Sequence, residues 1–348
     1  MHCAVIADDL TGACDSAVQF RLRGARSIAH IDFTAETDGQ AEVEAFTTDT
    51  RDVDQAELEA RICQVAQQAS ALSPKLIFKK IDSLLRGSPG REIFAAIDAF
   101  GCDAAVITPA YPELGRTVWD GQLYVDGNGA WKPIAVAELL REQGLAECAA
   151  VKPECIGEAL HDGARFISVD ATCAEDLDRL VSEALTDGRR LLWAGAGGLA
   201  SSLAQAVFGA PAEPRQPAPL ALPVFFCIGS NHPVTKAQLA RLQNGGRNHP
   251  ILSVSQDAGT YESLRFSLRE LDTKASALVL SGGASASTVC RALEATEIEL
   301  EGQIVPGVPW GRLRGGLLDG ILVATKSGAF GSEDTLVRVA DFFRCPQN

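Results

Sequence analysis

Short apolar segments alternate with amphipathic segments along almost the whole chain, and most apolar segments end in polar residues or glycines. Segments 3–6 and 43–47 have the length and composition of buried strands, whereas segments 13–22 and 55–71 carry apolar residues at helical spacing. This βαβα order is typical of parallel sheets that are covered by helices. The pattern therefore predicts an α/β fold with mainly parallel sheets.

The same alternation continues towards the end of the sequence. Segment 109–133, which is rich in glycine, proline and aromatic residues, is expected to form a long irregular loop, and such loops are usually functional or disordered. Further strands are expected at 76–78, 104–108, 166–169, 191–193, 224–228, 251–254, 277–280 and 321–325, and further helices at 92–100, 176–185, 199–207, 234–242, 261–271, 287–293 and 333–343.

The composition changes at residues 209–223, where five of the fifteen residues are proline. Proline-rich segments act as semi-rigid spacers. A chain of 348 residues has room for two domains. We therefore expect an N-terminal domain over residues 1–208, a linker over 209–223 and a smaller C-terminal domain over 224–348.

Charge and cysteine usage exclude several classes of protein. The formal net charge of −14 disfavours a nucleic-acid or anionic-membrane partner, because both require a basic face. The ten cysteines include no C-x-x-C pair and are expected to be reduced. No signal peptide and no apolar run of membrane-spanning length is evident. The sequence predicts a soluble, cytoplasmic protein.

The run from Ala7 to Asp15 places three acids where the first strand turns into the first helix. Asp9 or Thr11 could serve only as a helix cap. One acid would be enough for that role, whereas Asp8, Asp9 and Asp15 repel one another. In open α/β sheets the carboxyl ends of strands form the crevice where ligands bind. We therefore expect these acids to belong to a functional site.

Charged residues also follow three other predicted strands. Arg51 comes after the strand at 43–47, and Lys80 and Asp82 project from one face of the strand that begins at 76. A simple salt bridge would also explain the last two. Because Ser83, Arg86 and a glycine turn follow them, an oxyanion-binding and proton-handling cluster is favoured. Arg116, in segment 109–133, is a second candidate cation for a substrate carboxylate.

Glycine-rich turns follow three strands of the second domain, at 229–230, 281–285 and 326–331. Glycines allow backbone amides to approach phosphate oxygens, and a helix N-terminus favours negative charge. Tight connections alone would also use glycine, but three such turns in one small domain favour a nucleotide site. None matches a P-loop or a dinucleotide fingerprint. The five histidines show no metal-ligand spacing.

Eight motifs together resemble those of the four-carbon acid sugar kinase family. The resemblance implies a sugar-acid-binding N-terminal domain, an ATP-binding C-terminal domain, and Mg²⁺-assisted phosphorylation of threonate, erythronate or 3-oxo-tetronate, usually on the terminal hydroxyl O-4. A homodimer is a further expectation. The motifs are ADDLTGACD, TR at 50–51, KKIDSLLRG, PAYPELGR, LLWAGAGGLA, IGSNHPVTKAQ, SGGASAS and TKSGAFG.

The resemblance also implies roles for individual residues. The sugar-acid site would contain Asp8, Asp9, Asp15, Arg51, Lys80, Asp82, Ser83 and Arg86. Arg116, the second candidate cation named above, is expected to bind the substrate with them. The ATP site would contain Ser230, Gly282, Gly283, Ala284, Ser285, Gly328 and Gly331. The catalytic residues would be Asp82 or Asp9 as the base, together with Lys80.

Two positions depart from the family pattern. Ala284 stands where the family usually has glutamate, and Leu84 stands where it usually has threonine. The missing acid at position 284 motivates an alternative, a sugar-acid or nucleotide sensor of the same fold with impaired catalysis. A nicotinamide-dependent dehydrogenase is disfavoured because the dinucleotide fingerprint is missing. The expected enzyme class is a phosphotransferase with an alcohol group as acceptor.

Overall fold

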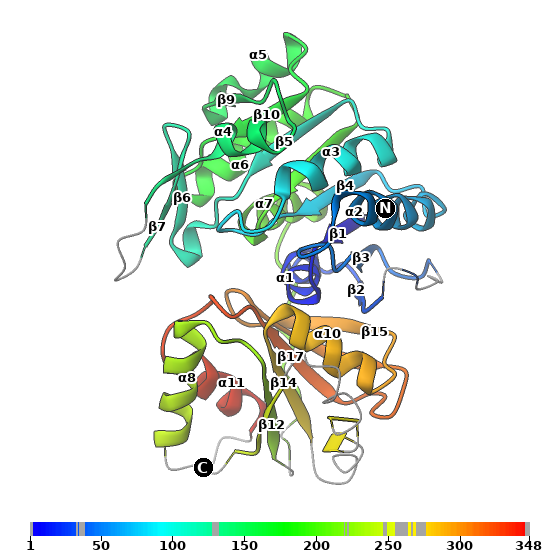
Figure 1. The fold of residues 1–348 in the computed structure, drawn as a ribbon, viewed down its shortest axis with the longest axis vertical. Helices are drawn as coiled ribbons and strands as arrows, with labels where there is room; N and C mark the ends of the chain where they lie inside the picture. Colours follow the sequence, from blue (N-terminus) through cyan, green and yellow to red (C-terminus); the bar gives the residue numbers. More distant parts are fainter. Residues whose placement is uncertain are drawn as a thin grey trace.

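The chain folds into two α/β domains, one above the other in Figure 1. The computed structural model describes residues 3–32, 34, 39–126, 132–218, 220, 223–245, 249–254, 264–265, 267–268 and 276–344. The predicted fold class, a mainly parallel α/β arrangement, is confirmed.

The N-terminal domain contains most of the helices and strands that the sequence pattern predicted. Its strands in the large sheet are β1 (Cys3–Ala7), β2 (Ser27–His30), β3 (Val43–Thr47), β4 (Leu76–Lys80), β5 (Ala104–Thr108), β9 (Ala149–Val151), β10 (Phe166–Val169) and β11 (Leu191–Gly195). Its α-helices are α1 (Leu10–Arg21), α2 (Gln55–Ser70), α3 (Pro89–Phe100), α4 (Val136–Glu142), α5 (Ile156–His161), α6 (Ala174–Leu185) and α7 (Gly197–Phe208).

The C-terminal domain repeats the same alternation on a smaller scale. Its strands are β12 (Val224–Ile228), β13 (Ile251–Ser253), β14 (Ala277–Ser281), β15 (Glu297–Val305), β16 (Val308–Arg314) and β17 (Leu322–Lys326). Its helices are α8 (Pro233–Asn244), α10 (Gly283–Ala292) and α11 (Thr335–Phe343). Most of the predicted helix at 261–271 lies outside the described residues.

The strands of both domains form a single sheet of 14 strands, in the order β13-β12-β14-β17-β16-β15-β2-β3-β1-β4-β11-β5-β10-β9. The junction is an antiparallel pairing of β2 with β15, in which Ala29 lies opposite Ile298. The sequence pattern did not predict β2, β15 or β16, although β15 alternates buried and half-buried residues along most of its length. The junction holds the two domains at a defined relative position.

Helices cover both faces of the sheet. On one face a continuous core joins α1, α6 and α7 of the N-terminal domain to α10 of the C-terminal domain. On the other face α2 and α3 cover the N-terminal strands, and α8 and α11 cover the C-terminal strands. Helix α1 lies between the two domains, and all twelve of its residues are buried.

Segment 109–133 is not the irregular loop that was expected. Strands β6 (Arg116–Trp119) and β7 (Gln122–Val125) form an antiparallel hairpin, and β8 (Ile134–Ala135) adds a third strand. Asp120 and Gly121 have positive φ values at the hairpin turn. The prediction of a loop was wrong because a hairpin turn brings two short strands together, whereas glycine and proline content alone suggests a loop.

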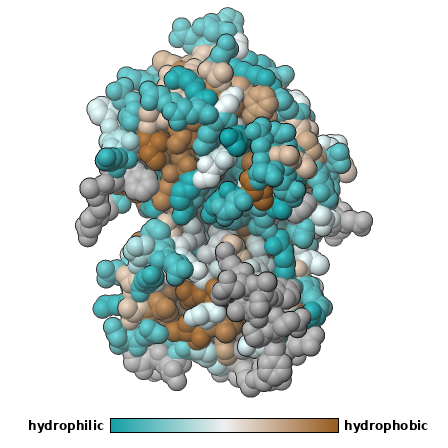
Figure 2. All heavy atoms as spheres, in the orientation of Figure 1, coloured by the Kyte–Doolittle hydropathy of each residue, from teal (hydrophilic) through white to brown (hydrophobic). Residues whose placement is uncertain are grey.

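None of the helices within the described ranges is long and apolar enough to cross a membrane. Figure 2 shows hydrophilic residues over most of the visible face of the N-terminal domain, with hydrophobic residues visible on the C-terminal domain. The nine described cysteines are free thiols, and Cys63 is exposed.

Candidate active site

The carboxyl ends of neighbouring strands from both domains border one cavity of about 500 Å³. From the N-terminal domain, the residues after β1 and β3 reach it, with Arg86 from the loop after β4. From the C-terminal domain, the turns after β12, β14 and β17 reach it. These are the edges at which open α/β sheets bind ligands, so the cavity is the candidate active site.

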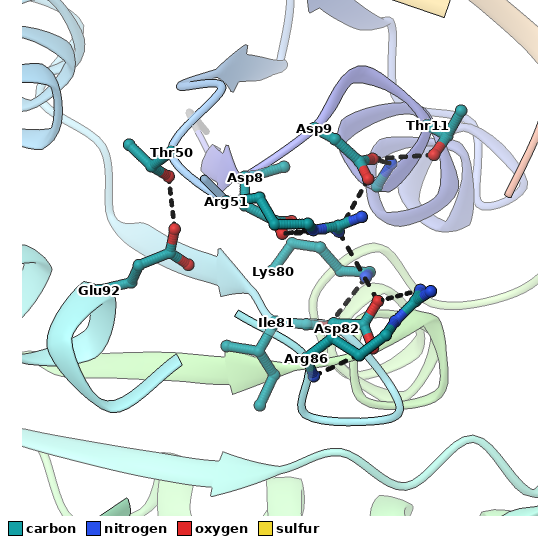
Figure 3. Close-up of polar contacts among 12 residues, drawn as sticks. Asp8, Asp9, Thr11, Thr50, Arg51, Lys80, Ile81, Asp82, Arg86 and Glu92 are labelled. Atoms are coloured by element: carbon teal, nitrogen blue, oxygen red, sulfur yellow. Dashed lines mark hydrogen bonds and ion pairs between the residues drawn. The ribbon is translucent and has the colours of Figure 1, made fainter. Parts of the chain in front are cut away.

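Asp9 occupies the N-cap position of α1 and also faces the C-terminal domain. Its Oδ1 accepts hydrogen bonds from the Gly12 amide (2.7 Å) and the Thr11 hydroxyl (2.8 Å), as Figure 3 shows in part. A Cβ added to Gly283 at the start of α10 would overlap the Asp9 carboxyl group. The Asp9 carboxylate therefore lies near the N-terminal ends of two helices, which favour negative charge.

Arg51, in the loop after β3, contacts acids in the loops after β1 and β4. Its Nε donates to Asp8 Oδ2 at 2.8 Å, and its Nη2 lies 2.6 Å from Asp8 Oδ2 and 2.8 Å from Asp9 Oδ2. A third carboxylate, that of Asp82, lies 3.6 Å from Nη2. The guanidinium thus offsets the mutual repulsion of these acids, and Figure 3 shows it at their centre.

The two neighbouring acids differ in their ionisation. Burial raises the pKa of Asp8 to about 6, and Asp9 adds to the rise while Arg51 opposes it. For Asp9, burial is outweighed by Arg51, Lys80 and the hydrogen bond from the Gly12 amide, so its pKa lies below the usual value. Asp9 is therefore the more strongly ionised member of the pair.

Asp82 is held within its own loop. It accepts hydrogen bonds from Arg86 Nε at 3.0 Å and Nη2 at 2.5 Å, and from the Leu84 amide at 2.9 Å. Burial opposes its ionisation, but Arg86, Lys80 and Arg51 together lower the pKa of Asp82 to about 2. With a pKa this low, the Asp82 carboxylate is a weak proton acceptor near neutral pH.

Lys79 and Lys80 point to opposite faces of β4, as the strand alternation predicts. Lys79 Nζ lies 2.9 Å from Glu92 on α3, a buried structural pair, and Glu92 also accepts a hydrogen bond from Thr50. The Lys80 side chain packs beside Gly12, and its Nζ donates to the Ile81 carbonyl at 2.8 Å. Lys80 lowers the pKa of Asp9, whereas Lys79 is paired with Glu92 and acts on the site only through its smaller effect on Asp8.

Asp15 lies deeper, one turn along α1 from Thr11. Both carboxylate oxygens are buried and have no hydrogen-bond partner among the described residues. Burial raises the pKa of Asp15 to about 6, and Lys80 opposes the rise. Gly197, at the start of α7, leaves room for this carboxylate and for the Tyr111 ring. Asp15 is not part of the cavity lining.

The three glycine-rich turns of the C-terminal domain pack tightly against one another. A Cβ on Gly229 would lie 2.6 Å from Ser285 Cβ, and a Cβ on Gly328 would lie 3.0 Å from Ser230 Cβ. Gly282 has a φ of +106°, which favours glycine at that position. Larger residues would therefore separate the turns and obstruct the cavity.

Lys326, which was not among the predicted site residues, organises the third turn from inside. Its side chain is fully buried, and its Nζ donates to the carbonyls of Ser327 (2.8 Å) and Phe330 (3.2 Å). Burial lowers the pKa of Lys326 to about 7. A lysine at a strand end carries no distinctive pattern, so only the fold reveals that the loop wraps around it.

Two contacts cross between the domains beside the cavity. Asp49 forms an ion pair with Arg291 on α10 and accepts a hydrogen bond from Ser287 at 3.4 Å. Arg116 lies over the Phe330 ring, 5.4 Å from its centroid, and donates to the Ala329 carbonyl at 3.4 Å. Arg116 therefore contacts the other domain rather than the cavity.

The structure brings most of the predicted residues to the cavity. Those in its lining are Asp8, Asp9, Arg51, Arg86, Ser230, Gly282, Gly283, Ala284, Ser285 and Gly328. Lys80, Asp82 and Ser83 follow or end β4 but are outside the lining, as are Asp15, Arg116 and Gly331. Lining residues that the predicted site did not include are Asp49, Asp52, Gly229, His232, Ser287, Thr288, Arg291, Ser327 and Ala329.

No group of three or more histidine, cysteine, aspartate or glutamate side chains in the described part of the chain is arranged to hold a metal ion. His232 caps α8 by accepting a hydrogen bond from the Val234 amide at 3.3 Å. Burial and the nearby cations Arg86 and Lys326 lower the pKa of His232. It is therefore a neutral residue of the lining.

Two family models match the chain, a sugar-binding N-terminal domain over residues 3–203 and a nucleotide-binding C-terminal domain over residues 262–336. A D-threonate kinase of Bordetella bronchiseptica is 31% identical over 403 aligned positions, which cover 99% of this chain and 98% of that protein. A D-erythronate kinase of Heliobacterium modesticaldum is 26% identical, with 97% of this chain and 96% of that protein covered.

Solved structures share the fold. One from Salmonella typhimurium LT2 superposes with a TM-score of 0.78 at 20% identity and covers 99% of this chain and 100% of its own. A domain of unknown function from Bordetella bronchiseptica, solved with citrate as a domain-swapped dimer, gives a TM-score of 0.51 at 30% identity and covers 99% and 98%. From the matched domains and the full-length kinase relatives, we conclude that the chain belongs to the four-carbon acid sugar kinase family.

Proposed function

We propose that the chain is an ATP-dependent kinase that phosphorylates a hydroxyl, O-4 in the simplest case, of threonate, erythronate or 3-oxo-tetronate. This makes it a phosphotransferase with an alcohol acceptor. The main support for this proposal is that a single cavity has an aspartate–arginine cluster on one side and three glycine-rich turns on the other. Its volume of about 500 Å³ lies in the usual range for small-ligand sites. The names of the kinase relatives support the same substrate class.

Arg51 and Arg86 are the proposed ligands of the substrate carboxylate. Each uses Nε and Nη2 for the aspartates described above, and neither donates a hydrogen bond from Nη1 to a described residue. Both side chains remain partly exposed, at 29% and 44%. The planar guanidinium can therefore engage a second carboxylate without releasing the first.

Asp9 is the proposed acceptor of the proton from the attacking hydroxyl. It is ionised, it lies in the cavity lining, and it faces the start of α10 on the phosphate side. Both acids accept hydrogen bonds or ion pairs on both oxygens, but Asp82 lies outside the cavity lining. Its two contacts with Arg86 make it better suited to positioning that arginine. The choice between the two acids, which sequence spacing leaves open, therefore favours Asp9.

The N-terminal end of α10 and the glycine turns are the proposed phosphate-binding elements. Backbone amides at a helix N-terminus attract phosphate oxygens, and Gly282 and Gly283 remove the side chains that would block them. Lys80 adds a positive charge close to Asp9. Such positioning and charge compensation account for most of the catalysis in phosphoryl transfer.

The residues present also suit Mg²⁺, which is held in kinases by one or two carboxylates and the nucleotide phosphates. Asp8 lines the cavity, and its Oδ1 is buried without a hydrogen-bond partner among the described residues. Asp8 is therefore the proposed ligand. When bound, the ion neutralises charge that develops on the transferred phosphoryl group.

A coupled assay of ADP release tests this proposal. The substrates are D- and L-threonate, D- and L-erythronate and 3-oxo-tetronate, with ATP, and glycerate and pentonates serve as acids of the wrong length. We expect turnover with at least one four-carbon acid and little with the others. Absence of turnover with every four-carbon acid would overturn the proposal.

Binding without turnover would instead support a sensor of the same fold. Ala284 motivates this second candidate, because it lines the cavity where the family pattern has an acid. Calorimetry with ATP and with each acid separates the two. Restoration of turnover by Ala284→Glu would identify the missing carboxylate as the cause.

A homodimer and a cytoplasmic location complete the proposal. The dimer is supported by a related protein of 30% identity that was solved as a domain-swapped dimer. The cytoplasm supplies ATP and suits free thiols such as those of the nine described cysteines. Light scattering coupled to size-exclusion chromatography measures the oligomeric state directly, and a monomeric mass would contradict the dimer.

A further inference from the structure

A second cavity of about 290 Å³, here called the back cavity, lies at the opposite end of α1 from Asp9. Its lining combines the last turn of α1, the proline-rich segment 211–215 and part of β15. Helix α1 has 12 residues, so the back cavity and the active site are separated by roughly 18 Å along the helix. The back cavity therefore borders the three segments that connect the two domains.

Arg21 is the feature of the back cavity that ordinary packing does not explain. Its side chain is only 8% exposed, yet it makes no hydrogen bond and no ion pair with any described residue. The Arg21 guanidinium nitrogens keep some contact with solvent, so they are open to an anion in the back cavity. Burial and the charge of Arg215 both lower the pKa of Arg21. The fold thus keeps two like-charged arginines near one another at the cavity wall.

Glu301 and Glu299 oppose this lowering of the Arg21 pKa, but both carboxylates are already engaged by other arginines. Glu301 is engaged by Arg312 Nε at 2.7 Å, and Glu299 is engaged by Arg314 and Arg26. Glu213 also lines the back cavity but is exposed on the linker. Including Arg23, the back cavity has three arginines against two glutamates, in a chain whose net charge is −14.

Neutral polar groups complete the wall and cross between the domains. Gln19 Nε2 donates one hydrogen bond to Gln303 Oε1 at 3.0 Å and another to the backbone carbonyl of Asp15 at 3.2 Å. Ser201 adds a hydroxyl from α7. Gln19 Nε2 uses both of its protons in these contacts, so the Gln303 amide and the Ser201 hydroxyl are the neutral groups that orient an oxyanion after the arginines have attracted it.

We propose that the back cavity is a second binding site, for a small oxyanion such as phosphate or a phosphorylated short-chain acid, and that its occupant holds α1, the linker and β15 together. The volume of about 290 Å³ suits such an anion better than a nucleotide. Because the active site needs both domains in place, an anion in the back cavity stabilises the closed arrangement. This proposal does not depend on which acid the kinase site accepts.

The test is the unfolding temperature of the full chain, titrated with inorganic phosphate and, separately, with a phosphorylated four-carbon acid. Sodium chloride at matched ionic strength corrects for screening. The variants are Arg21→Gln and Arg215→Gln, and Arg179→Gln, an exposed arginine on α6, is the control. Arg51→Gln removes the contribution of the kinase site.

We expect both anions, or one of them, to raise the unfolding temperature of the wild type, the control and Arg51→Gln. In the Arg21→Gln and Arg215→Gln variants, the anion concentration that gives half of this increase should be roughly tenfold higher or more. This is the usual effect of losing one charge-assisted hydrogen bond. Arg215 is exposed, so its variant tests the proposal even if Arg21→Gln folds poorly. An undiminished response in Arg215→Gln, or no response in the wild type and Arg51→Gln, overturns the proposal.

Discussion

A Cβ on Gly283 would lie 2.8 Å from Asp9 Cβ and would overlap the Asp9 carboxyl group. One residue starts α10 in the C-terminal domain, and the other caps α1 in the N-terminal domain. The close approach is possible only because Gly283 has no side chain. It brings the proposed proton acceptor next to the proposed phosphate-binding helix end.

Gly283→Ala is therefore expected to move α10 away from Asp9 and to lower kcat/KM by roughly 100-fold, since misplacement of about 1 Å can have that effect. Gly157→Ala is the matched control. Its Cβ would meet nothing closer than 3.9 Å, and it lies in helix α5, where alanine is favoured. Steady-state kinetics and thermal unfolding of both variants check the prediction. Equal kinetics for the two variants would contradict it.

Asp9→Asn and Asp82→Asn are expected to differ in their kinetic effects. Asparagine still caps α1 but loses the ion pair with Arg51, so the first variant should be somewhat less stable and should lose kcat by roughly 10²–10⁴-fold, the usual contribution of a general base. The second loosens Arg86 and should mainly raise KM for the sugar acid. Steady-state assays distinguish these outcomes. Loss of kcat confined to Asp82→Asn would reassign the base.

Lys326→Met is expected to change how stability depends on pH. Burial lowers the pKa of Lys326 from 10.5 to about 7, so between pH 7 and 10.5 the unfolded chain binds a proton that the folded chain releases. The contribution of Lys326 to the free energy of unfolding therefore rises with pH in that window, by at most about 1.4 kcal/mol per pH unit. Chemical denaturation from pH 7 to 10 measures the slope.

The Lys326→Met variant should lose that slope, whereas Lys75→Met, which removes an exposed lysine, should retain it. If both variants retain the wild-type slope, Lys326 stays protonated in the folded protein, and the proposed effect of burial on its pKa is wrong.

Asp15 is expected to contribute a pH dependence of stability opposite to that of Lys326, and Asp15→Asn should remove it. Burial raises the pKa of Asp15 from 3.8 to about 6, so between those values the folded chain holds a proton that the unfolded chain has released. The contribution of this group to stability is present below pH 4 and is lost as the pH rises through 6. The variant should therefore gain stability relative to the wild type between pH 4 and 6.

Denaturant unfolding at pH 4, 5, 6 and 7 checks this prediction. Asp8 titrates in the same range, so the informative quantity is the difference between wild type and Asp15→Asn. A constant difference across these pH values would mean that Asp15 is ionised throughout.

Much of the fold was predictable because local patterns carry it. Strands such as β1 and β5 lie within the sheet as largely apolar runs, and helices such as α2 repeat their buried residues at helical spacing. The missed elements are those whose stability depends on distant partners. β2 has only four residues and is paired with β3 and β15, which lie in different domains.

For the site, the sequence alone determined which groups are available: acids, arginines and glycines at strand ends, whose chemistry follows from residue type and from the αβ rhythm. Which of them meet was decided by the tertiary structure. The β2–β15 junction brings Asp9 to Gly283 and Asp49 to Arg291, and folding of segment 116–125 into a hairpin carries Arg116 to Phe330. Contacts between residues hundreds of positions apart depend on how whole domains pack, and no local pattern records that packing.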